Sequence, residues 1–184
     1  VFDEKRVFTP GPAPGPVVIK GVRIGVPICE DIWTEEACET LAETGAEILL
    51  SPNGSPFEQN KDDVRLNLVV ARVTETGLPL AYLNQVGGQD ELVFDGASFV
   101  LNADRSLAIQ MPAWSEDVVL TTWTKAKGTW VCARGETVKI EEGIESAYQA
   151  CVLGLRDYVA KNGFPGVVLG LSGGIDSALV AAIA

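Results

Sequence analysis

Short apolar runs alternate with amphipathic segments along the first half of this chain, and this alternation limits the folds that it can adopt. Residues 46–50 and 80–85 have the length of buried strands, and the apolar side chains of residues 62–76 recur at helical spacing. A sheet with helices packed against it accommodates such an order. We therefore predict a mixed α/β fold, with antiparallel strand pairs over residues 91–101 and 106–123.

Two short strands and a helix are predicted ahead of the first buried run. The strands span residues 17–20 and 22–27. Asp31 or Thr34 can cap the helix that follows, because their side-chain oxygens accept the free N–H groups of a first helical turn. Cys29 therefore falls on the turn between a strand and a helix.

A change in composition divides the chain into two expected domains, residues 1–123 and 141–184. Residues 124–140 between them are polar, and we interpret them as a linker. The second domain begins with an amphipathic helix over residues 141–161, whose apolar face includes Ile144 and Tyr158. The apolar run at residues 166–171 predicts a buried strand. A strand, a glycine-rich turn and a helix in this order open a nucleotide-binding α/β domain.

The sequence SGGIDS at residues 172–177 lies between that strand and a final helix. Its two glycines let the backbone approach an anion closely, and the N–H groups of the first helical turn favour negative charge. The hydroxyls of Ser172 and Ser177 add donors, whereas the Asp176 carboxylate suits a cation beside phosphates. The segment lacks the GK[ST] ending of a Walker A loop and the third glycine of a GxGxxG fingerprint. The alternative is a plain glycine-rich turn with an Asp/Ser cap.

Cys29 has the surroundings of a nucleophile. On a strand-to-helix turn a side chain is exposed, and the backbone N–H of the next residue, here Glu30, can face a developing oxyanion. The helix dipole behind such a turn also favours the thiolate. The alternative is a buried structural cysteine, which is our interpretation of Cys38, Cys132 and Cys151.

Composition excludes several classes of function. The chain has no histidine, so neither a Ser–His nor a Cys–His pair can form within it, and Cys29 needs a carboxylate or a lysine as its base. The formal net charge of −11 disfavours a nucleic-acid partner. No apolar stretch has the length of a membrane span, and residues 1–20 do not resemble a signal peptide. We therefore predict no membrane association and a cytoplasmic location.

Several segments resemble known families. SGGIDS resembles the pyrophosphate-binding loop of the ATP pyrophosphatases, which adenylate a substrate with ATP. GVRIGVPICEDIW at residues 21–33 resembles the cysteine region of the nitrilase superfamily, in the form that the glutamine-hydrolysing NAD⁺ synthetases have. VFDEKRVFTPG at residues 1–11, SPNGSPF at 51–57 and LNQVGGQDELVFDGAS at 83–98 resemble that family's post-lysine loop, glutamine-site loop and following strand. The order of the segments also matches that family.

This resemblance implies a fold and a reaction. The fold is a partial nitrilase-like α-β-β-α sandwich, followed by the start of an adenine-nucleotide alpha-hydrolase-like (Rossmann-like) domain. The reaction is the ATP-dependent amidation of nicotinic acid adenine dinucleotide to NAD⁺ with ammonia released from glutamine. The implied partners are glutamine, the dinucleotide and ATP with Mg²⁺, without a tightly bound organic cofactor. The parent protein is expected to be a homo-oligomer.

The resemblance also assigns residues. Cys29 matches the nucleophile, and the glutamine-site candidates are Glu30, Ser55, Phe57 and Arg65, with Arg65 a candidate for the substrate's carboxylate. The alternative for Arg65 and Lys61 is ordinary solvated helix charge. The ATP-binding candidates are Ser172, Gly173, Gly174, Ile175, Asp176 and Ser177, with Asp176 also a candidate metal ligand. Glu4 matches an accessory carboxylate or is an exposed turn acid. The family's catalytic Glu and Lys precede VFDEKR, so we expect no glutaminase turnover from these 184 residues alone.

Three other interpretations stay open at this point. A stand-alone nitrilase-type amidase explains Cys29 but leaves SGGIDS without a role. Another ATP pyrophosphatase amidotransferase, of the GMP or asparagine synthetase type, explains SGGIDS but would bring a His-containing triad or an N-terminal cysteine. A truncated or degenerate chain that serves only as a scaffold is the third.

Overall fold

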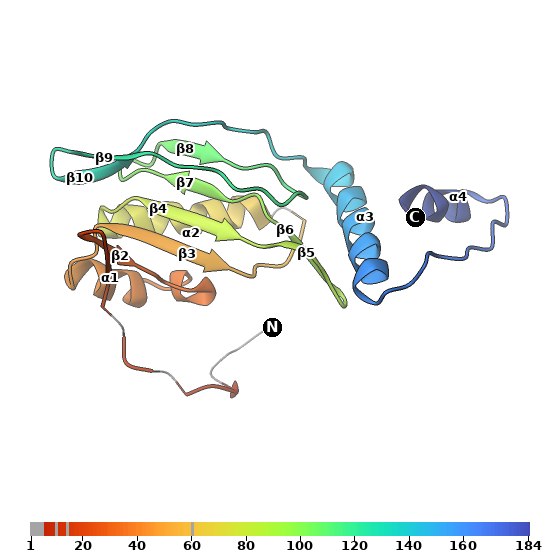
Figure 1. Ribbon diagram of the computed structural model, residues 1–184, viewed down its shortest axis with the longest axis horizontal. Helices are drawn as coiled ribbons and strands as arrows, with labels where there is room; N and C mark the ends of the chain where they lie inside the picture. Colours follow the sequence, from red (N-terminus) through yellow and green to blue (C-terminus); the bar gives the residue numbers. More distant parts are fainter. Residues whose placement is uncertain (1–5, 10, 14, 60) are drawn as a thin grey trace.

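A six-stranded sheet forms the centre of the structure, with the strand order β1-β2-β3-β4-β7-β8 (Figure 1). The computed structural model describes residues 6–9, 11–13, 15–59 and 61–184. Strands β2, β3 and β4 run parallel to one another. Strand β1 is antiparallel to β2, β7 is antiparallel to β4, and β8 is antiparallel to β7. The strands are β1 (Val17–Ile19), β2 (Val22–Gly25), β3 (Ile48–Asn53), β4 (Leu80–Asn84), β7 (Phe99–Leu101) and β8 (Leu107–Gln110).

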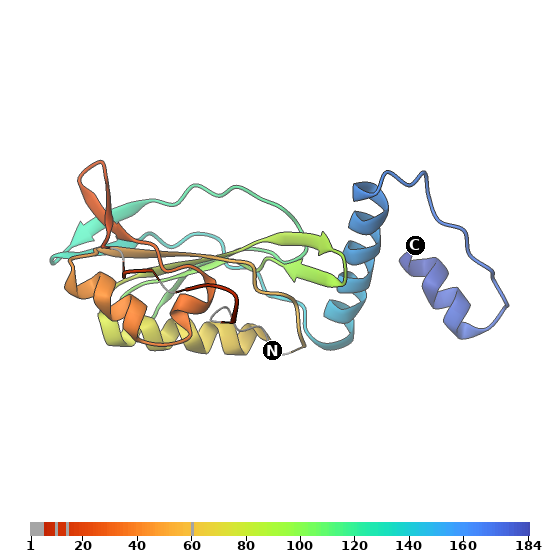
Figure 2. The ribbon, with the colours of Figure 1, turned by 90° about the horizontal axis from the view of Figure 1, so that it is seen from below.

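Helices α1 (Glu36–Glu43) and α2 (Lys61–Thr76) lie on one face of this sheet (Figure 2). Alternate residues of β3 and β4 point toward them, so Leu49 and Leu80 are fully buried. The core between the helices and the sheet consists of Ile32, Cys38, Leu41, Ala46, Leu49, Val69, Val73, Leu80, Tyr82, Phe99 and Leu101. The predicted mixed α/β fold and the two buried strands around a helix are confirmed, with boundaries shifted by three residues or fewer.

The opposite face of the same strands is only partly covered. Leu83 on β4 is 61% exposed and Leu50 on β3 is 36% exposed, although both are apolar. On the β7–β8 side, a smaller core of Val100, Ala108, Ile109 and Cys132 forms on this face. The sheet therefore has one face closed by helices and one face that is open over its central strands.

The predicted linker over residues 124–140 contains a β-hairpin. Strands β9 (Trp123–Ala126) and β10 (Thr129–Cys132) pair antiparallel, and the backbone of Cys132 exchanges hydrogen bonds with the Asn102 amide at 2.8 and 3.1 Å. The polar side chains that suggested a linker belong to the solvent side of this hairpin, whereas Cys132 is buried in the smaller core. Strand pairing was also predicted too widely upstream, because residues 111–122 form no regular strand.

A second hairpin extends from the sheet toward the C-terminal part of the chain, where it meets helix α3 (Figure 1). Strands β5 (Val86–Gln89) and β6 (Leu92–Asp95) form it, and α3 spans Gly143–Lys161 as predicted. The buried face of α3 consists of the small or medium-sized Ser146, Ala150 and Leu153. The larger Ile144 and Tyr158, which we expected on that face, are 89% and 49% exposed.

The buried strand predicted at residues 166–171 is absent from the structure. These residues have no regular secondary structure, and Val168 and Leu171 are largely exposed. A strand needs a neighbour that takes its hydrogen bonds, and no described strand lies alongside this segment. Helix α4 (Ile175–Ile183) follows as expected and touches α3, where the Tyr148 hydroxyl donates to the Ala182 carbonyl at 3.0 Å.

The two faces of β4 predict different costs for the same substitution. Leu80→Ala leaves a cavity beneath α2 and is expected to lower the free energy of unfolding by about 2–5 kcal/mol. Leu83→Ala removes a side chain from the open face and is expected to change it by about 0.5 kcal/mol or less. Urea denaturation of both variants of the 184-residue chain measures the difference. Equal losses would show that the open face is buried in solution.

Candidate active site

Cys29 occupies a strained turn that follows strand β2 after a short connecting segment, residues 26–28. Its φ angle is +50°, in the left-handed region that residues other than glycine seldom adopt, and it is the first residue of a short 3₁₀-helix, η2 (Cys29–Ile32). The Asp31 carboxylate accepts the N–H of Ile28 at 2.8 Å, while the Asp31 N–H donates to the Ile28 carbonyl at 3.0 Å. Asp31 therefore caps this turn, and the longer helix α1 begins only at Glu36. Strain of this kind clusters at functional sites.

The Cys29 thiol is half-buried and lies at the beginning of η2. The backbone N–H groups of a first helical turn have no acceptor within the helix, so those of Cys29 and Glu30 need an acceptor from outside η2. The strand-to-helix turn predicted for Cys29 is thus confirmed as a local geometry, while its catalytic role is still a prediction.

Tyr82 on β4 connects Cys29 electrostatically with the loop after β3. Burial raises the pKa of Tyr82. The positive charge of Arg65 and a hydrogen bond with Ser55 lower this pKa, whereas negative charge at Cys29 raises it. The Tyr82 phenol therefore lies within electrostatic reach of both Cys29 and Ser55. The structure brings the predicted nucleophile and one glutamine-site candidate into one region, beside the ends of parallel strands β2, β3 and β4.

The loop that carries Ser55 and Phe57 is held on both sides by neighbouring backbone and side chains. The N–H of Ser55 donates to the Asn84 side chain at 2.9 Å, whose amide nitrogen donates back to the Ser55 carbonyl at 3.1 Å. The N–H of Phe57 donates to the Val93 carbonyl at 2.7 Å, and its ring meets the Trp114 ring edge-on with centroids 5.1 Å apart. The loop is therefore fixed in place before any ligand binds.

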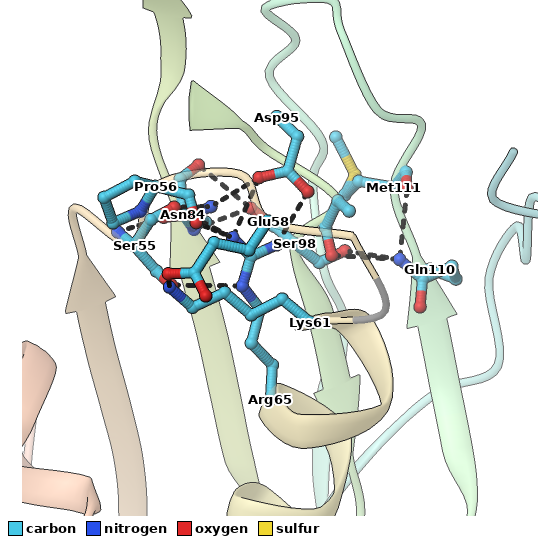
Figure 3. A network of polar contacts seen from close by, with 11 residues as sticks. Ser55, Pro56, Glu58, Lys61, Arg65, Asn84, Asp95, Ser98, Gln110 and Met111 are labelled. Atoms are coloured by element: carbon cyan, nitrogen blue, oxygen red, sulfur yellow. Dashed lines mark hydrogen bonds and ion pairs between the residues drawn. The ribbon is translucent and has the colours of Figure 1, made fainter. Parts of the chain in front are cut away.

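Arg65 on α2 is the centre of this network (Figure 3). Its guanidinium forms a two-pronged ion pair with Asp95 at 2.7 and 2.9 Å, and both side chains are less than 5% exposed. Its other donors reach the Ser55 hydroxyl at 3.1 Å, the Ser55 carbonyl at 2.9 Å and the Pro56 carbonyl at 3.1 Å. The alternative of solvated helix charge is therefore wrong for Arg65, and its nitrogens are already engaged by the chain.

Lys61, one turn earlier on α2, pairs with Glu58 at 2.6 Å. This hydrogen bond from Lys61 holds the pKa of Glu58 below its ordinary value. The lysine side chain is 19% exposed, so it is a partly buried member of the loop and not freely solvated charge. Glu4, the candidate accessory carboxylate, lies outside the described residues.

Two residues that sequence reasoning missed are essential to the geometry. Asp95 was predicted only as part of the strand pair over residues 91–101, and Asn84 only as a strand residue. Both are buried, and they are bonded to Arg65 and Ser55. A signal was present, because a carboxylate in the apolar alternation of residues 92–95 must have a cationic partner if it is buried.

The other cysteines differ from Cys29. Burial raises the pKa of the Cys38 thiol to about 11, and burial also raises that of Cys132. Both cysteines are buried, as predicted for structural cysteines. The prediction that Cys151 lies in the core is wrong, since it is exposed on α3. Its neighbours Ala150 and Leu153 occupy the buried face instead.

The SGGIDS segment forms an exposed turn at the beginning of α4. Gly173 has a φ angle of +87°, which favours glycine, and Gly174 precedes the first helical residue. The hydroxyls of Ser172 and Ser177 lie 3.0 Å apart, and Ser177 donates to the Gly174 carbonyl at 3.0 Å. The structure thus brings these predicted residues together, with free N–H groups at a helix N-terminus that fit an anion.

Within the described part of the chain, no three acidic, cysteine or histidine side chains gather into a group that fits a metal ion. Asp176 is the one acidic residue in the first turn of α4. A single carboxylate suits a metal ion whose other ligands come from the phosphates of a nucleotide. Nor does any described helix have the length and apolar character needed to cross a membrane.

The fold is an α/β half-sandwich that places a cysteine on a strand-to-helix turn, with a pre-formed loop beside it. The chain belongs to the carbon-nitrogen hydrolase family, whose model matches residues 1–128. Residues 147–184 match a second family model, NAD synthase. The expected order of two family segments in one chain is therefore confirmed.

Relatives with both segments are similar to the whole chain. A glutamine-dependent NAD(+) synthetase of Rhodobacter capsulatus is 53% identical over all 184 residues, which cover 33% of that protein. The structure of glutamine-dependent NAD+ synthetase from Acinetobacter baumannii in complex with ADP matches the whole chain with a TM-score of 0.89 and 40% identity, over 34% of its own length. The chain thus spans about a third of the length of these relatives.

A third likeness concerns the first segment alone. A mutant of the amidase from Nesterenkonia sp. AN1, described with covalent addition of an acetamide moiety at its active site cysteine, matches 59% of this chain and 41% of its own. The TM-score is 0.50 and the identity is 31%. The nitrilase-like interpretation of the first segment and the mixed sheet are thereby confirmed.

The difference in burial among the cysteines predicts selective alkylation. At pH 8, iodoacetamide is expected to label Cys29 and Cys151 and to spare Cys38 and Cys132, because a buried, protonated thiol is a poor nucleophile. Peptide mass spectrometry of the native chain, with Cys151→Ala as a background that isolates Cys29, measures this. Labelling of Cys38 before Cys29 would contradict the assignment.

The buried ion pair predicts a large loss of stability when one partner is neutralised. Asp95→Asn removes the charge that is paired with the buried Arg65 guanidinium and is expected to lower the free energy of unfolding by about 3–5 kcal/mol. Arg23→Gln at the half-exposed pair with Glu47 is the control, with an expected change of about 1 kcal/mol or less. Denaturant titration compares them, and similar losses in the two variants would mean that the Asp95 pair is not buried.

Proposed function

We propose that the protein of which this chain forms part is a glutamine-hydrolysing NAD⁺ synthetase, in which Cys29 is the nucleophile that releases ammonia from glutamine. The observation that carries the proposal is the strained turn of Cys29 beside a pre-formed Ser55–Phe57 loop, in a chain that also contains the SGGIDS turn. A stand-alone amidase would not account for this turn or for the match of residues 147–184 to NAD synthase.

The chemistry of the first site follows from the turn. The Cys29 thiolate attacks the amide carbon of glutamine, and the oxyanion that forms is stabilised by the N–H of Glu30. The C–N bond then breaks, ammonia leaves with the proton that the thiol gave up, and a thioester is left on Cys29. Water hydrolyses that thioester to glutamate and restores the thiol. The base and the lysine for these steps come from the family's Glu–Lys–Cys set.

The loop residues have separate roles in this proposal. Ser55 and Phe57 line the glutamine pocket, because they are presented on a fixed loop next to the cysteine turn. Arg65 supports that loop from below and does not bind the substrate's carboxylate, since its guanidinium is occupied by Asp95 and by the loop's own oxygens. The prediction of Arg65 as a carboxylate ligand is therefore replaced by a structural role.

The second site would hold ATP at the SGGIDS turn. Ser172 and Ser177 supply hydroxyl donors, and the backbone of Gly173, Gly174 and Ile175 at the start of α4 faces the pyrophosphate. Asp176 would share Mg²⁺ with the phosphates. ATP supplies the adenylation of nicotinic acid adenine dinucleotide that lets ammonia displace AMP. The absence of a tightly bound organic cofactor, a cytoplasmic location and a homo-oligomeric parent protein also stay predictions.

Replacing Cys29 in the full-length protein separates the two sites. Cys29→Ala is expected to abolish NAD⁺ formation from glutamine, because no thioester can form, and to leave NAD⁺ formation from ammonium within about twofold of the unmodified protein. Cys151→Ala, which removes an exposed cysteine, is the matched control and is expected to change neither rate. Both rates are measured with nicotinic acid adenine dinucleotide and ATP.

Two outcomes would contradict the proposal in different ways. Glutamine-driven synthesis that persists in Cys29→Ala would make this cysteine structural and leave the rest of the function intact. A full-length unmodified protein that forms no NAD⁺ from either nitrogen source would remove the synthetase function itself and favour the scaffold interpretation.

A further inference from the structure

The hairpin β5–β6 is held along both of its edges, by different parts of the chain. On the β5 edge, the N–H of Gly88 donates to the Asp157 carboxylate of α3 at 2.8 Å, and the Gly88 carbonyl accepts from the Lys161 ammonium. On the β6 edge, the carbonyl of Val93 accepts the N–H of Phe57 at 2.7 Å. Gly88 and Val93 face each other in the strand register. In an antiparallel pair whose two residues are not hydrogen-bonded to each other, the backbone groups point away from the partner strand. Those of Gly88 and Val93 are therefore available to α3 and to Phe57.

The backbone of helix α3 lies close to the backbone of Gly88 and to the side chain of Val93. A Cβ atom on Gly88 would lie 3.0 Å from the Cα of Gly154, and a Cβ atom on Gly154 would lie 3.0 Å from Cγ2 of Val93. Both distances are shorter than ordinary van der Waals contact, so only glycine fits at either position without a shift of the hairpin or the helix. The small residues on the buried face of α3 are explained by the same close approach.

We propose that Asp157 is a positioning residue for the glutamine loop, and that it acts on Phe57 through Gly88 and Val93. A two-stranded hairpin is only marginally stable by itself, so its position depends on what holds its edges. Asp157, Lys161 and Gly154 fix the β5 edge, and Phe57 donates its N–H to the Val93 carbonyl on the β6 edge. This path rests on the proposed function, because Phe57 matters to catalysis only if its loop binds glutamine.

The path joins the two segments that the family models divide. Asp157 lies within residues 147–184, which match NAD synthase, whereas Phe57 and the hairpin lie within residues 1–128, which match the carbon-nitrogen hydrolase family. A residue of the nucleotide-binding segment therefore sets the geometry of the amide-hydrolysing site. Arg65, paired with Asp95, holds the neighbouring Ser55 and Pro56 of the same loop, so loosening the hairpin displaces the loop without releasing it.

Substitutions in the full-length protein test Asp157 directly. Asp157→Ala removes the acceptor for the Gly88 N–H and is expected to raise the KM for glutamine on the order of 10-fold, since small displacements of binding groups carry large penalties. The rate of ammonium-driven synthesis is expected to stay within about twofold. Asp157→Asn keeps a carbonyl oxygen at the same place and is expected to restore most of the affinity.

Two further variants keep the test decisive. Glu145→Ala removes a carboxylate from the same helix, away from the hairpin, and is expected to leave the KM for glutamine unchanged. Gly154→Ala introduces the Cβ that meets Val93 and is expected to raise the KM with the Asp157 acceptor still present. Amide hydrogen exchange reports the path without any activity: the N–H groups of Gly88 and Phe57 are expected to exchange faster in Asp157→Ala than in Glu145→Ala.

Three results would overturn the positioning role: an unchanged KM for glutamine in Asp157→Ala, an Asp157→Asn variant as impaired as the alanine variant, or losses that are equal for glutamine and ammonium. Unchanged exchange at Phe57 would overturn it as well. Failure of the proposed function is distinguishable, because the unmodified protein would then make no NAD⁺ while the exchange difference at Phe57 persisted.

Discussion

The buried ion pair between Arg65 and Asp95 is the interaction on which the candidate site depends. Each charge would be costly to bury alone, and the pair is tolerated because the remaining donors of Arg65 are used by the Ser55 and Pro56 carbonyls and the Ser55 hydroxyl. The pair joins α2 to the end of β6, and the Ser55–Phe57 loop lies between them. A loop that would otherwise need its own hydrogen-bond partners is thereby ordered in advance, which is what a site for amide chemistry requires.

The hairpin β5–β6 connects the Phe57 loop with helix α3, which belongs to the second segment. Asp95 ends strand β6 and Val93 belongs to the same strand, so the ion pair and the bond to Phe57 hold one loop from two neighbouring points. On the opposite edge the hairpin meets Gly154 and Asp157 of α3, which leaves no free edge at the register of Gly88 and Val93. The contacts that cover the edges of this hairpin thus also fix the position of the Phe57 loop relative to α3.

Local periodicity was enough to predict the helices and strands that depend on the spacing of apolar residues within their own segment. It failed for features that depend on residues far away in the sequence. Strands β3 and β4 and helix α2 were predicted because apolar spacing alone specifies them. The roles of Arg65 and Asp95 were not, because the partners are 30 residues apart and each looks like a surface charge in its own segment. The strand expected at residues 166–171 failed for a related reason, since apolar content does not supply a hydrogen-bonded neighbour.

The buried face of α3 shows how hydropathy can mislead in a physically consistent way. Sequence spacing placed the large apolar residues Ile144 and Tyr158 on the inner face, whereas the structure buries Ser146, Ala150 and Leu153 and brings Gly154 onto the hairpin. A helix that must bring its backbone within reach of a strand's backbone excludes large side chains from the contact, so the face that meets the hairpin consists mostly of small residues. Geometry, and not burial of apolar area, is the property that this contact preserves, as expected of a surface that fixes the position of a site.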